Sequence, residues 1–218
     1  MTCPLCGRRE PRAGRTPAWA LVRGVSYRRC PACGYVRLDR ERILPPEAEK
    51  ARYLLHRNDP DDPGYRAYLE AFIREAVQPF VGPGGRILDF GSGPEPALAY
   101  RLADRGYRVS VYDPFFAPDR NARKGPFDLV AVHEVAEHLV RPYFELARLA
   151  RILAPGGRIS LRTRFSPEDP RKFEEWWYRE DPTHVGFFGS RTFAALAERL
   201  GMAVERDDGV EIVVLRGR

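Results

Sequence analysis

Residues 87–94 read Ile87-Leu88-Asp89-Phe90-Gly91-Ser92-Gly93-Pro94, and this stretch decides the fold class of the chain. A short apolar run ends in an acidic residue and then in a turn that contains glycine. This order predicts a buried β-strand over residues 86–90, a loop, and a helix that begins near Ala97. Small residues in such a loop let the backbone approach a ligand closely. The stretch therefore predicts an α/β fold with a ligand site where its first core strand ends.

Strands and helices alternate along the chain after this turn. We expect strands over residues 108–113, 127–133 and 158–163, and helices over 97–105, 142–153 and 191–200. Ser190 is a plausible N-cap of the last helix and Gly201 its C′ residue. Residues 203–206 and 211–215 suit a terminal antiparallel hairpin. The alternation favours a Rossmann-like, doubly wound parallel sheet with helices on both faces.

The part of the chain before the sheet divides into a cysteine-rich head and a connector. Prolines and acids punctuate residues 41–63, which we expect to hold a short helix over 46–55. Apolar residues at helical spacing between Tyr65 and Phe80 predict an amphipathic helix. We therefore expect a head over 1–40, a connector over 41–63 and an α/β domain over 64–218, with an insertion at 165–189.

The four cysteines form two C-x-x-C pairs near the N-terminus, Cys3/Cys6 and Cys30/Cys33. Two such turns facing each other supply four thiolates in a tetrahedron, the arrangement that Zn²⁺ prefers. A glycine follows the second cysteine of each pair, which suits a tight turn. The pattern predicts a small zinc ribbon in which the metal is structural, because no ligand position stays open. Two disulfides or a redox pair are the alternatives.

The charge of the chain is uneven. The net charge is +6, and residues 1–45 hold ten arginines against three acids. A basic head is compatible with an RNA or acidic partner, and equally with a solvated arginine-rich surface. The chain lacks an apolar run long enough to span a membrane and an apolar signal core. We expect a cytoplasmic protein with no membrane contact.

Asp113 ends the strand that follows the glycine turn, twenty residues after Gly93. An acidic residue at this place can accept hydrogen bonds from both hydroxyls of a ribose. The glycine turn, the spaced acid and the following β–α units together favour a nucleoside-containing cofactor.

These motifs resemble class I S-adenosylmethionine-dependent methyltransferases over roughly residues 65–218. The resemblance rests on Asp89-x-Gly91-x-Gly93, Asp113, the segment 127–138 and the turn Leu153-x-Pro155-Gly156-Gly157. With its head, the whole chain is similar to a bacterial subgroup that carries an N-terminal zinc ribbon. The resemblance implies that S-adenosylmethionine contacts Asp89, Gly91, Ser92, Gly93, Asp113, Pro114 and Glu134, with the adenine near Phe115 and Phe116.

The chain departs from that family in two places. Glu95 replaces the third glycine of the loop, which disfavours a loop that clamps a pyrophosphate. Only thirteen residues, 114–126, join Asp113 to the next strand. A helix and a strand barely fit in this length. We therefore expect the usual third strand, and the acidic adenine contact that follows it, to be vestigial or missing.

Candidates for the chemistry follow two strand ends. His133 and Glu134 come directly after one strand, and His133 is a candidate base. Glu134-x-x-Glu137-His138 resembles the turn of ubiquinone-biosynthesis O-methyltransferases that can hold a divalent metal such as Mg²⁺. In other relatives the same turn is only the start of a helix.

The insertion at 165–189 carries the second candidate group. Its Asp181-x-Thr183-His184-Val185 segment resembles one in bacterial small-molecule methyltransferases in which the histidine approaches the transferred methyl. His184 is the main candidate for general base or substrate orienter, and the alternative is a buried structural histidine. Trp176, Trp177 and Tyr178 either line a substrate pocket or close the cleft as core. His56 could cover the site from the connector.

The expected function is O- or N-methylation of a small or glycan-related metabolite. An RNA methyltransferase that uses the basic ribbon is the first alternative. Residues 127–135 lack the Asn-Pro-Pro-Tyr-like turn of amino-group methylases, which counts against it. A non-catalytic binding module is the second alternative. The sequence names neither the acceptor nor the oligomeric state.

Overall fold

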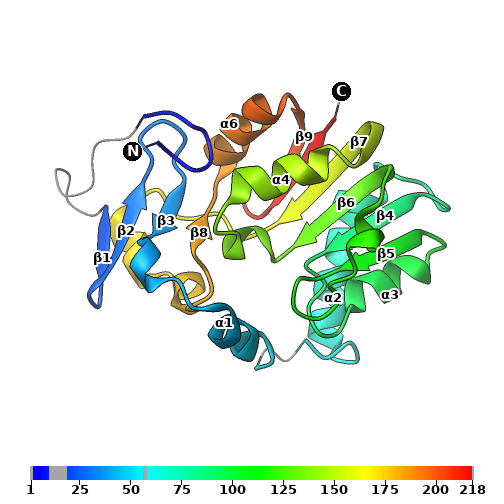
Figure 1. The fold of residues 1–218 in the computed structure, drawn as a ribbon, viewed down its shortest axis with the longest axis horizontal. Helices are drawn as coiled ribbons and strands as arrows, with labels where there is room; N and C mark the ends of the chain where they lie inside the picture. The colour runs from blue at the N-terminus through cyan, green and yellow to red at the C-terminus, as the bar shows by residue number, and fades with distance from the viewer. Residues whose placement is uncertain (1, 10–18, 56–57, 218) are drawn as a thin grey trace.

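The computed structural model describes residues 2–9, 19–55 and 58–217. Its main sheet has six strands in the order β5-β4-β6-β7-β10-β9. The strands are β4 (Arg86–Phe90), β5 (Arg108–Tyr112), β6 (Phe127–His133), β7 (Leu153–Arg162), β9 (Ala203–Asp207) and β10 (Ile212–Arg216). The first four are parallel, and β10 runs antiparallel to both β7 and β9. The predicted Rossmann-like sheet with its C-terminal antiparallel hairpin is confirmed (Figure 1).

The segment between β5 and β6 contributes no strand to the sheet. In this segment, residues 114–126, Ala117 forms an isolated antiparallel bridge back to Asp113, and residues Arg120–Arg123 form the 3-10 turn η3. β5 is therefore an edge strand, and the third strand of the usual arrangement is missing. The length of the connection explains this. Each crossover between parallel strands needs about a dozen residues, so thirteen residues leave no room for a further strand between β5 and β6.

Helices cover both faces of the sheet, as buried parallel strands require. On one face lie α2 (Pro63–Phe72), its π-helical continuation η2 (Ile73–Val77) and α3 (Ala97–Ala103). On the other face lie α4 (Pro142–Ala150) and α6 (Ser190–Leu200) (Figure 1). Ser190 is the first residue of α6 rather than its N-cap, which is Gly189 and has no side chain to cap with. Gly201 ends α6 in the left-handed region, as predicted.

The cysteine-rich head and the insertion share one small sheet. Strands β1 (Ala20–Val22), β2 (Val25–Arg29) and β3 (Val36–Leu38) form a meander, and β8 (Gly186–Phe187) pairs with β3. The remaining elements of the insertion are α5 (Pro170–Glu175) and the 3-10 turn η5 (Trp177–Glu180). A buried aromatic cluster that includes Tyr27, Phe173 and Phe187 joins them. The insertion is thus held in place by the head.

The cysteine turns also pack onto the large domain. Leu5, Cys30, Cys33 and Tyr35 are buried in the same core cluster as residues of α4 and α6. The hydroxyl of Thr192 on α6 donates a hydrogen bond of 3.0 Å to the carbonyl oxygen of Cys33. The connector then runs through the 3-10 turn η1 (Arg40–Arg42) and α1 (Pro46–Tyr53) beneath the insertion (Figure 1).

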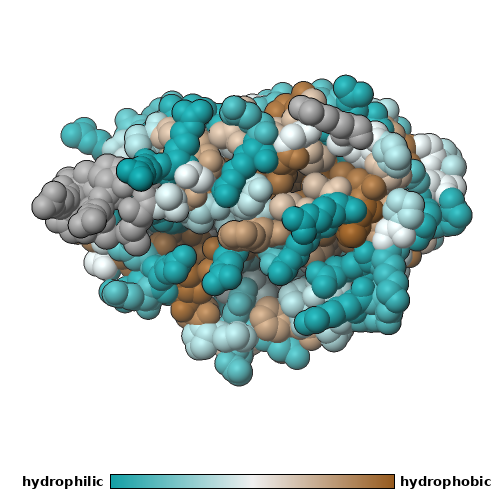
Figure 2. Space-filling model, turned by 45° about the horizontal axis from the view of Figure 1, so that its top comes forward, coloured by the Kyte–Doolittle hydropathy of each residue, from teal (hydrophilic) through white to brown (hydrophobic). Residues whose placement is uncertain are grey.

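Hydrophilic side chains dominate one face of the described molecule. Figure 2 shows hydrophilic side chains over most of the face that it presents, with small apolar areas between them. Within the described ranges, no helix is both long and apolar enough to cross a membrane.

Candidate active site

One cavity of about 610 Å³ opens at the carboxyl ends of β4, β5 and β6. It lies between these strand ends, α2, the connector helix α1 and the insertion. It is lined by Asp89, Gly91, Ser92, Gly93, Asp113, Pro114 and Glu134, the residues predicted to contact the cofactor. Of the two residues expected near the adenine, Phe115 lines it and Phe116 does not. The structure therefore brings the predicted set together in one place, and the prolines beside the glycine turn do not close it.

The two glycines of the turn do different things. Both have positive φ, +81° at Gly91 and +70° at Gly93, which favours glycine. A Cβ at Gly91 would lie 2.5 Å from Cγ2 of Val135, whereas a Cβ at Gly93 would meet no protein atom within 4 Å. Gly91 is thus required by the packing of the loop. Gly93 leaves room at the wall of the cavity.

Asp113 stands beside this turn with its carboxylate fixed by the backbone. Its Oδ2 accepts a hydrogen bond of 3.0 Å from the Gly93 N–H, and its Oδ1 accepts from the N–H groups of Phe115 and Phe116. The side chain is 6% exposed. Asp89 is also buried, its Oδ2 has no hydrogen-bond partner, and burial raises the pKa of Asp89 to about 7. The two carboxyls suit a ligand that brings hydroxyl or ammonium donors.

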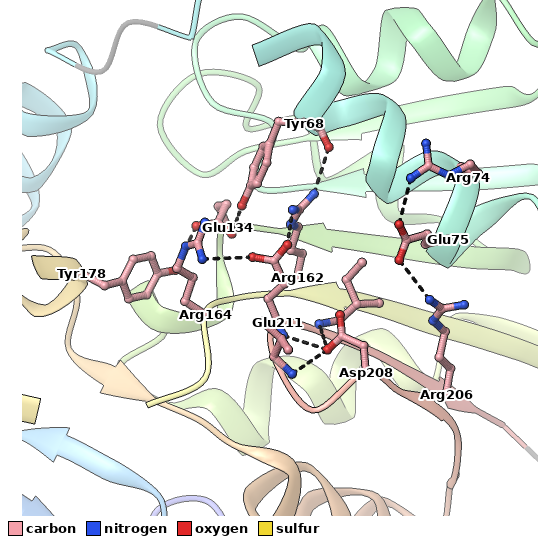
Figure 3. Close-up of polar contacts among 12 residues, drawn as sticks. Tyr68, Arg74, Glu75, Glu134, Arg162, Arg164, Tyr178, Arg206, Asp208 and Glu211 are labelled. Atoms are coloured by element: carbon pink, nitrogen blue, oxygen red, sulfur yellow. Dashed lines mark hydrogen bonds and ion pairs between the residues drawn. The ribbon is translucent and has the colours of Figure 1, made fainter. Parts of the chain in front are cut away.

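The carboxyl groups of Glu134 and Glu137 share the hydroxyl of Tyr178 as a hydrogen-bond partner. That hydroxyl lies 2.9 Å from Glu134 Oε2 and 2.7 Å from Glu137 Oε1, and Tyr68 donates to Glu134 Oε1 at 2.7 Å. Figure 3 shows Tyr68 of α2 reaching down to Glu134, with Tyr178 arriving from the insertion. Glu134 itself has a φ of +53°, a strained conformation for this residue type. Strain of this kind gathers at functional sites.

Burial makes this pair of acids reluctant to ionise. It raises the pKa of Glu134 to about 8 and that of Glu137 to about 7. The Glu137 charge adds to the rise at Glu134, and the Asp181 charge adds to the rise at Glu137. Tyr178 has one hydroxyl proton, so it donates to one carboxylate and accepts from the other acid when that acid is protonated. The pair therefore holds a proton near neutral pH.

His184, the main candidate base, lines the cavity with a defined ring orientation. Its Nδ1 lies 2.6 Å from the carbonyl oxygen of Tyr178, which can only accept. The Nδ1 position therefore carries the proton, and Nε2 is the basic nitrogen of the neutral ring. His138 is oriented in the same way by the Thr183 carbonyl, at 3.1 Å. The rings of His138 and His184 meet edge to face, with 4.8 Å between their centroids.

His133 also lines the cavity, but it is less suited to accept a proton. Its ring packs against Tyr68 and Phe72, and its Nε2 has no hydrogen-bond partner. Burial and the nearby Arg162 charge lower the pKa of His133 to about 3. A ring this weakly basic stays neutral at physiological pH.

The aromatic residues of the insertion divide between two roles. Trp177 and Tyr178 line the cavity, and the Trp177 side chain is 63% exposed at its rim. Trp176 does not line it; this side chain packs against Phe173 and Phe187. The prediction that Trp176 lines a substrate pocket is therefore not supported by its position. His56 lies outside the described residues.

The connector forms a further wall of the cavity, which the motifs in the sequence did not indicate. Glu49, Arg52 and Tyr53 of α1 line it together with Asp181, which forms an ion pair of 2.9 Å with Arg52. The Tyr53 hydroxyl donates to Glu49 at 2.6 Å. The i, i+3, i+4 spacing of these residues on a short helix is the signal that could have indicated a functional face.

The four cysteines come together as a compact cluster. Their sulfur atoms all lie within 4.8 Å of one another, with 3.8 Å between Cys3 and Cys33 and between Cys6 and Cys30. These four cysteines form no disulfide. A tetrahedron of sulfurs about 2.3 Å from a zinc ion has edges of about 3.8 Å. The donor set and its spacing fit zinc.

A second group of metal-ligand types lies in the cavity wall. Ligand atoms of Glu137, His138 and His184 lie within 4.8 Å of one another. Glu134, which the predicted Mg²⁺ site included, is not part of this group. Nothing in the described structure supports Mg²⁺ at Glu134, Glu137 and His138, and the turn is the 3-10 segment η4 (Ala136–His138).

The strand order, the hairpin and the glycine turn beside Asp113 together define a class I S-adenosylmethionine-dependent methyltransferase domain. The sequence profile described as "Methyltransferase domain" matches residues 65–206, and the chain belongs to this family. A comparison with curated proteins found no match.

Several solved methyltransferase structures share the fold. The 1,6-didemethyltoxoflavin-N1-methyltransferase of Burkholderia thailandensis is 15% identical, with a TM-score of 0.55 over 92% of this chain and 99% of that one. A chain from the complex of the Haloferax volcanii Trm112 methyltransferase activator with a putative methyltransferase is 14% identical, with a TM-score of 0.52 over 77% and 96%. The pyocyanin biosynthetic protein PhzM is 16% identical, with a TM-score of 0.52 over 71% and 56%. This chain thus spans little more than half of PhzM.

Proposed function

We propose that this methyltransferase transfers the methyl group of S-adenosylmethionine to an oxygen or nitrogen atom of a small or glycan-related metabolite. One observation carries the proposal. A single cavity is lined by the glycine turn with Asp113 on one side and by His184, Glu134 and Tyr178 on the other. A cofactor bound at the first group would present its methyl to an acceptor at the second.

The cofactor half would be formed by the ends of β4 and β5. Asp89, Gly91, Ser92 and Gly93 would lie beside the methionine part, and Asp113 would hold the ribose. Asp113 now accepts from the Gly93 N–H, so ribose hydroxyls would compete for a carboxylate that is already oriented. Pro114 and Phe115 line the cavity next to it and would bound the nucleoside. Glu134 lies at the junction of the two halves.

The acceptor half would align the nucleophile and remove its proton. Methyl transfer is an in-line displacement, so the acceptor atom must be held on the far side of the methyl from sulfur. His184 Nε2 is the proposed proton acceptor or hydrogen-bond acceptor for the nucleophile, with His133 as the weaker candidate. Trp177 and Tyr178 would contact the body of the substrate, and His56 and Trp176 stay predictions without support from the described cavity.

The four-cysteine cluster is proposed to hold a structural zinc ion. Four thiolates leave no open ligand position, and a head this small needs the metal to fold. Cysteines without disulfides fit a reducing compartment, which supports the proposed cytoplasmic location.

The experiment is a transfer assay with S-adenosylmethionine labelled in its methyl group. The purified protein is offered a small-molecule extract, ribosomal RNA and protein in parallel. We expect label in small molecules only. The matched variant is His184→Asn, whose side-chain amide can keep the bond to the Tyr178 carbonyl. It should bind S-adenosylhomocysteine normally and turn over about 10²–10⁴-fold more slowly.

The remaining outcomes decide between the alternatives. Label in RNA, weakened steeply by salt, would establish the RNA methyltransferase. No transfer together with no binding of S-adenosylhomocysteine would establish a non-catalytic module.

A further inference from the structure

The charge of the cavity is opposite to that of the chain. The protein carries a net charge of +6, yet the described lining residues include eight carboxylic acids and a single arginine. That arginine, Arg52, forms an ion pair with Asp181 and so contributes no unbalanced positive charge. The acids are Glu49, Asp89, Glu95, Asp113, Glu134, Glu137, Glu180 and Asp181.

These acids divide between the two halves of the cavity. Asp89, Glu95 and Asp113 belong to the strand ends and the glycine turn, where the cofactor is proposed to bind. Glu134 and Glu137 belong to the turn after β6, on the side of His184. Glu49 of α1 lies near Asp113 instead, and burial together with the Asp113 charge raises the pKa of Glu49. The acceptor side therefore stays acidic when the cofactor half is filled. Glu180 is paired with Arg179 at the rim, and Arg162 behind Tyr68 is paired with Glu211 (Figure 3).

Two of the acids are buried and incompletely paired. Glu137 is fully buried and its Oε2 has no hydrogen-bond partner, and the same holds for Oδ2 of Asp89 at 3% exposure. A buried carboxyl with an open acceptor position costs free energy until a donor reaches it. Burial raises the pKa of Glu134 and Glu137, and a nearby cation would let them ionise. A ligand that donates hydrogen bonds and carries a positive charge would therefore satisfy the open acceptor positions of these acids and stabilise their ionised form.

The rings around these acids suit the same kind of ligand. Tyr53, Tyr65, Tyr68 and Trp177 line the cavity. The faces of such rings attract ammonium groups and also pack against flat apolar bodies. An anionic acceptor would find carboxylates and no unpaired arginine among the described lining residues, and like charges repel at this range.

We propose that the acceptor is an organic amine with an apolar or aromatic body and no anionic group. This inference rests on the proposed function and narrows its substrate class. The amine would enter as ammonium beside the Glu134–Glu137 pair. It would lose one proton to that pair or to His184. The nitrogen lone pair would then form the N–CH₃ bond as the S–CH₃ bond breaks, with its electron pair left on sulfur. The second proton would leave the methylated nitrogen for solvent or His184.

The test compares matched ligands on protein saturated with S-adenosylhomocysteine, whose sulfur is neutral. Benzylamine and phenethylamine are the amine probes, and benzoate and phenylacetate are the carboxylate probes. Affinities are measured by calorimetry at two salt concentrations. We expect each amine to bind at least about tenfold more tightly than its matched carboxylate. Because the chain has a net positive charge, non-specific binding would favour the carboxylates. A preference for amines would therefore show that the probes bind in the acidic cavity.

Two variants locate the effect. Glu134→Gln keeps an oxygen acceptor for the Tyr68 hydroxyl and should reduce the preference for amines several-fold. Glu198→Gln, on the exposed face of α6 and outside the cavity, should leave it unchanged. Tighter or equal binding of the carboxylates, or no measurable binding of either amine, overturns the inference. Failure of S-adenosylhomocysteine itself to bind is a different result, and it contradicts the proposed function instead.

Discussion

Replacing Gly91 by alanine tests the conformation of the turn on which the cofactor site depends. The new methyl group would lie 2.5 Å and 2.8 Å from the two Cγ atoms of Val135, and the residue would keep a φ of +81°. Overpacking of this kind costs about 1–3 kcal/mol. The left-handed backbone costs a non-glycine residue about 1–2 kcal/mol more. We therefore expect Gly91→Ala to lower the unfolding free energy by about 2–5 kcal/mol.

The expected size sets the assay and its controls. For a domain of this length the loss corresponds to a melting temperature lower by about 5–15 °C, measured by thermal unfolding. Gly93→Ala adds a methyl that meets no protein atom, so it should lose only the backbone cost, about 1–2 kcal/mol. It should nonetheless weaken S-adenosylhomocysteine binding more than tenfold, because the methyl would occupy the cavity wall.

A double variant separates overlap from backbone strain. Val135→Ala removes both Cγ atoms that the Gly91→Ala methyl would touch, so Gly91→Ala should cost about 1–3 kcal/mol less in that background. The reasoning is refuted if Gly91→Ala and Gly93→Ala destabilise the protein equally. It is also refuted if Val135→Ala does not reduce the cost of Gly91→Ala.

Three further changes probe the rest of the site. Asp113→Asn should weaken S-adenosylhomocysteine binding about 10–100-fold in a calorimetric titration, since hydrogen bonds to a charged group contribute about 1.5–3 kcal/mol. The control is Asp119→Asn, at an exposed position, which should leave binding unchanged. The carboxyl of Glu134 has a folded-state pKa raised from 4.5 to about 8, so its stabilising contribution is complete below pH 4.5 and is lost as the pH rises through 8. Glu134→Gln should therefore be more stable than the wild type above pH 8, by about 1–3 kcal/mol in urea unfolding, and a variant that is less stable there contradicts the assignment. Cys33→Ser should abolish the one-to-one zinc content seen by native mass spectrometry. It should also lower the melting temperature, because Cys33 packs in the core shared with α6. An unchanged melting temperature after metal loss would show that the cluster is not a structural metal site.

Sequence patterns were sufficient for the main sheet. The apolar runs that end in Asp89 and His133 predicted β4 and β6 because buried parallel strands need continuous apolar residues. The missing third strand followed from the length of 114–126 alone. The hairpin was expected from the two short segments 203–206 and 211–215 near the C-terminus. These are local signals, so no tertiary contact was needed to find them.

Contacts between distant segments could not be predicted in the same way. β8 has two residues, Gly186 and Phe187, and becomes a strand only because β3 lies beside it. Trp176 follows α5 and packs against Phe173 and Phe187, whereas Trp177 begins the 3-10 turn η5 at the cavity rim, so their different positions depend on how the insertion folds. The wall formed by α1 has only the helical spacing of Glu49, Arg52 and Tyr53 as a sequence signal, and its role appears when the connector folds over the strand ends.

The most direct test of the account is a crystal structure of the protein with S-adenosylhomocysteine. We expect the nucleoside in the cavity beside Gly91 and Gly93, the ribose hydroxyls on the Asp113 carboxylate, and the sulfur facing the side that holds His184. A nucleoside bound elsewhere, or bound there with Asp113 still turned only to its own backbone, would contradict it.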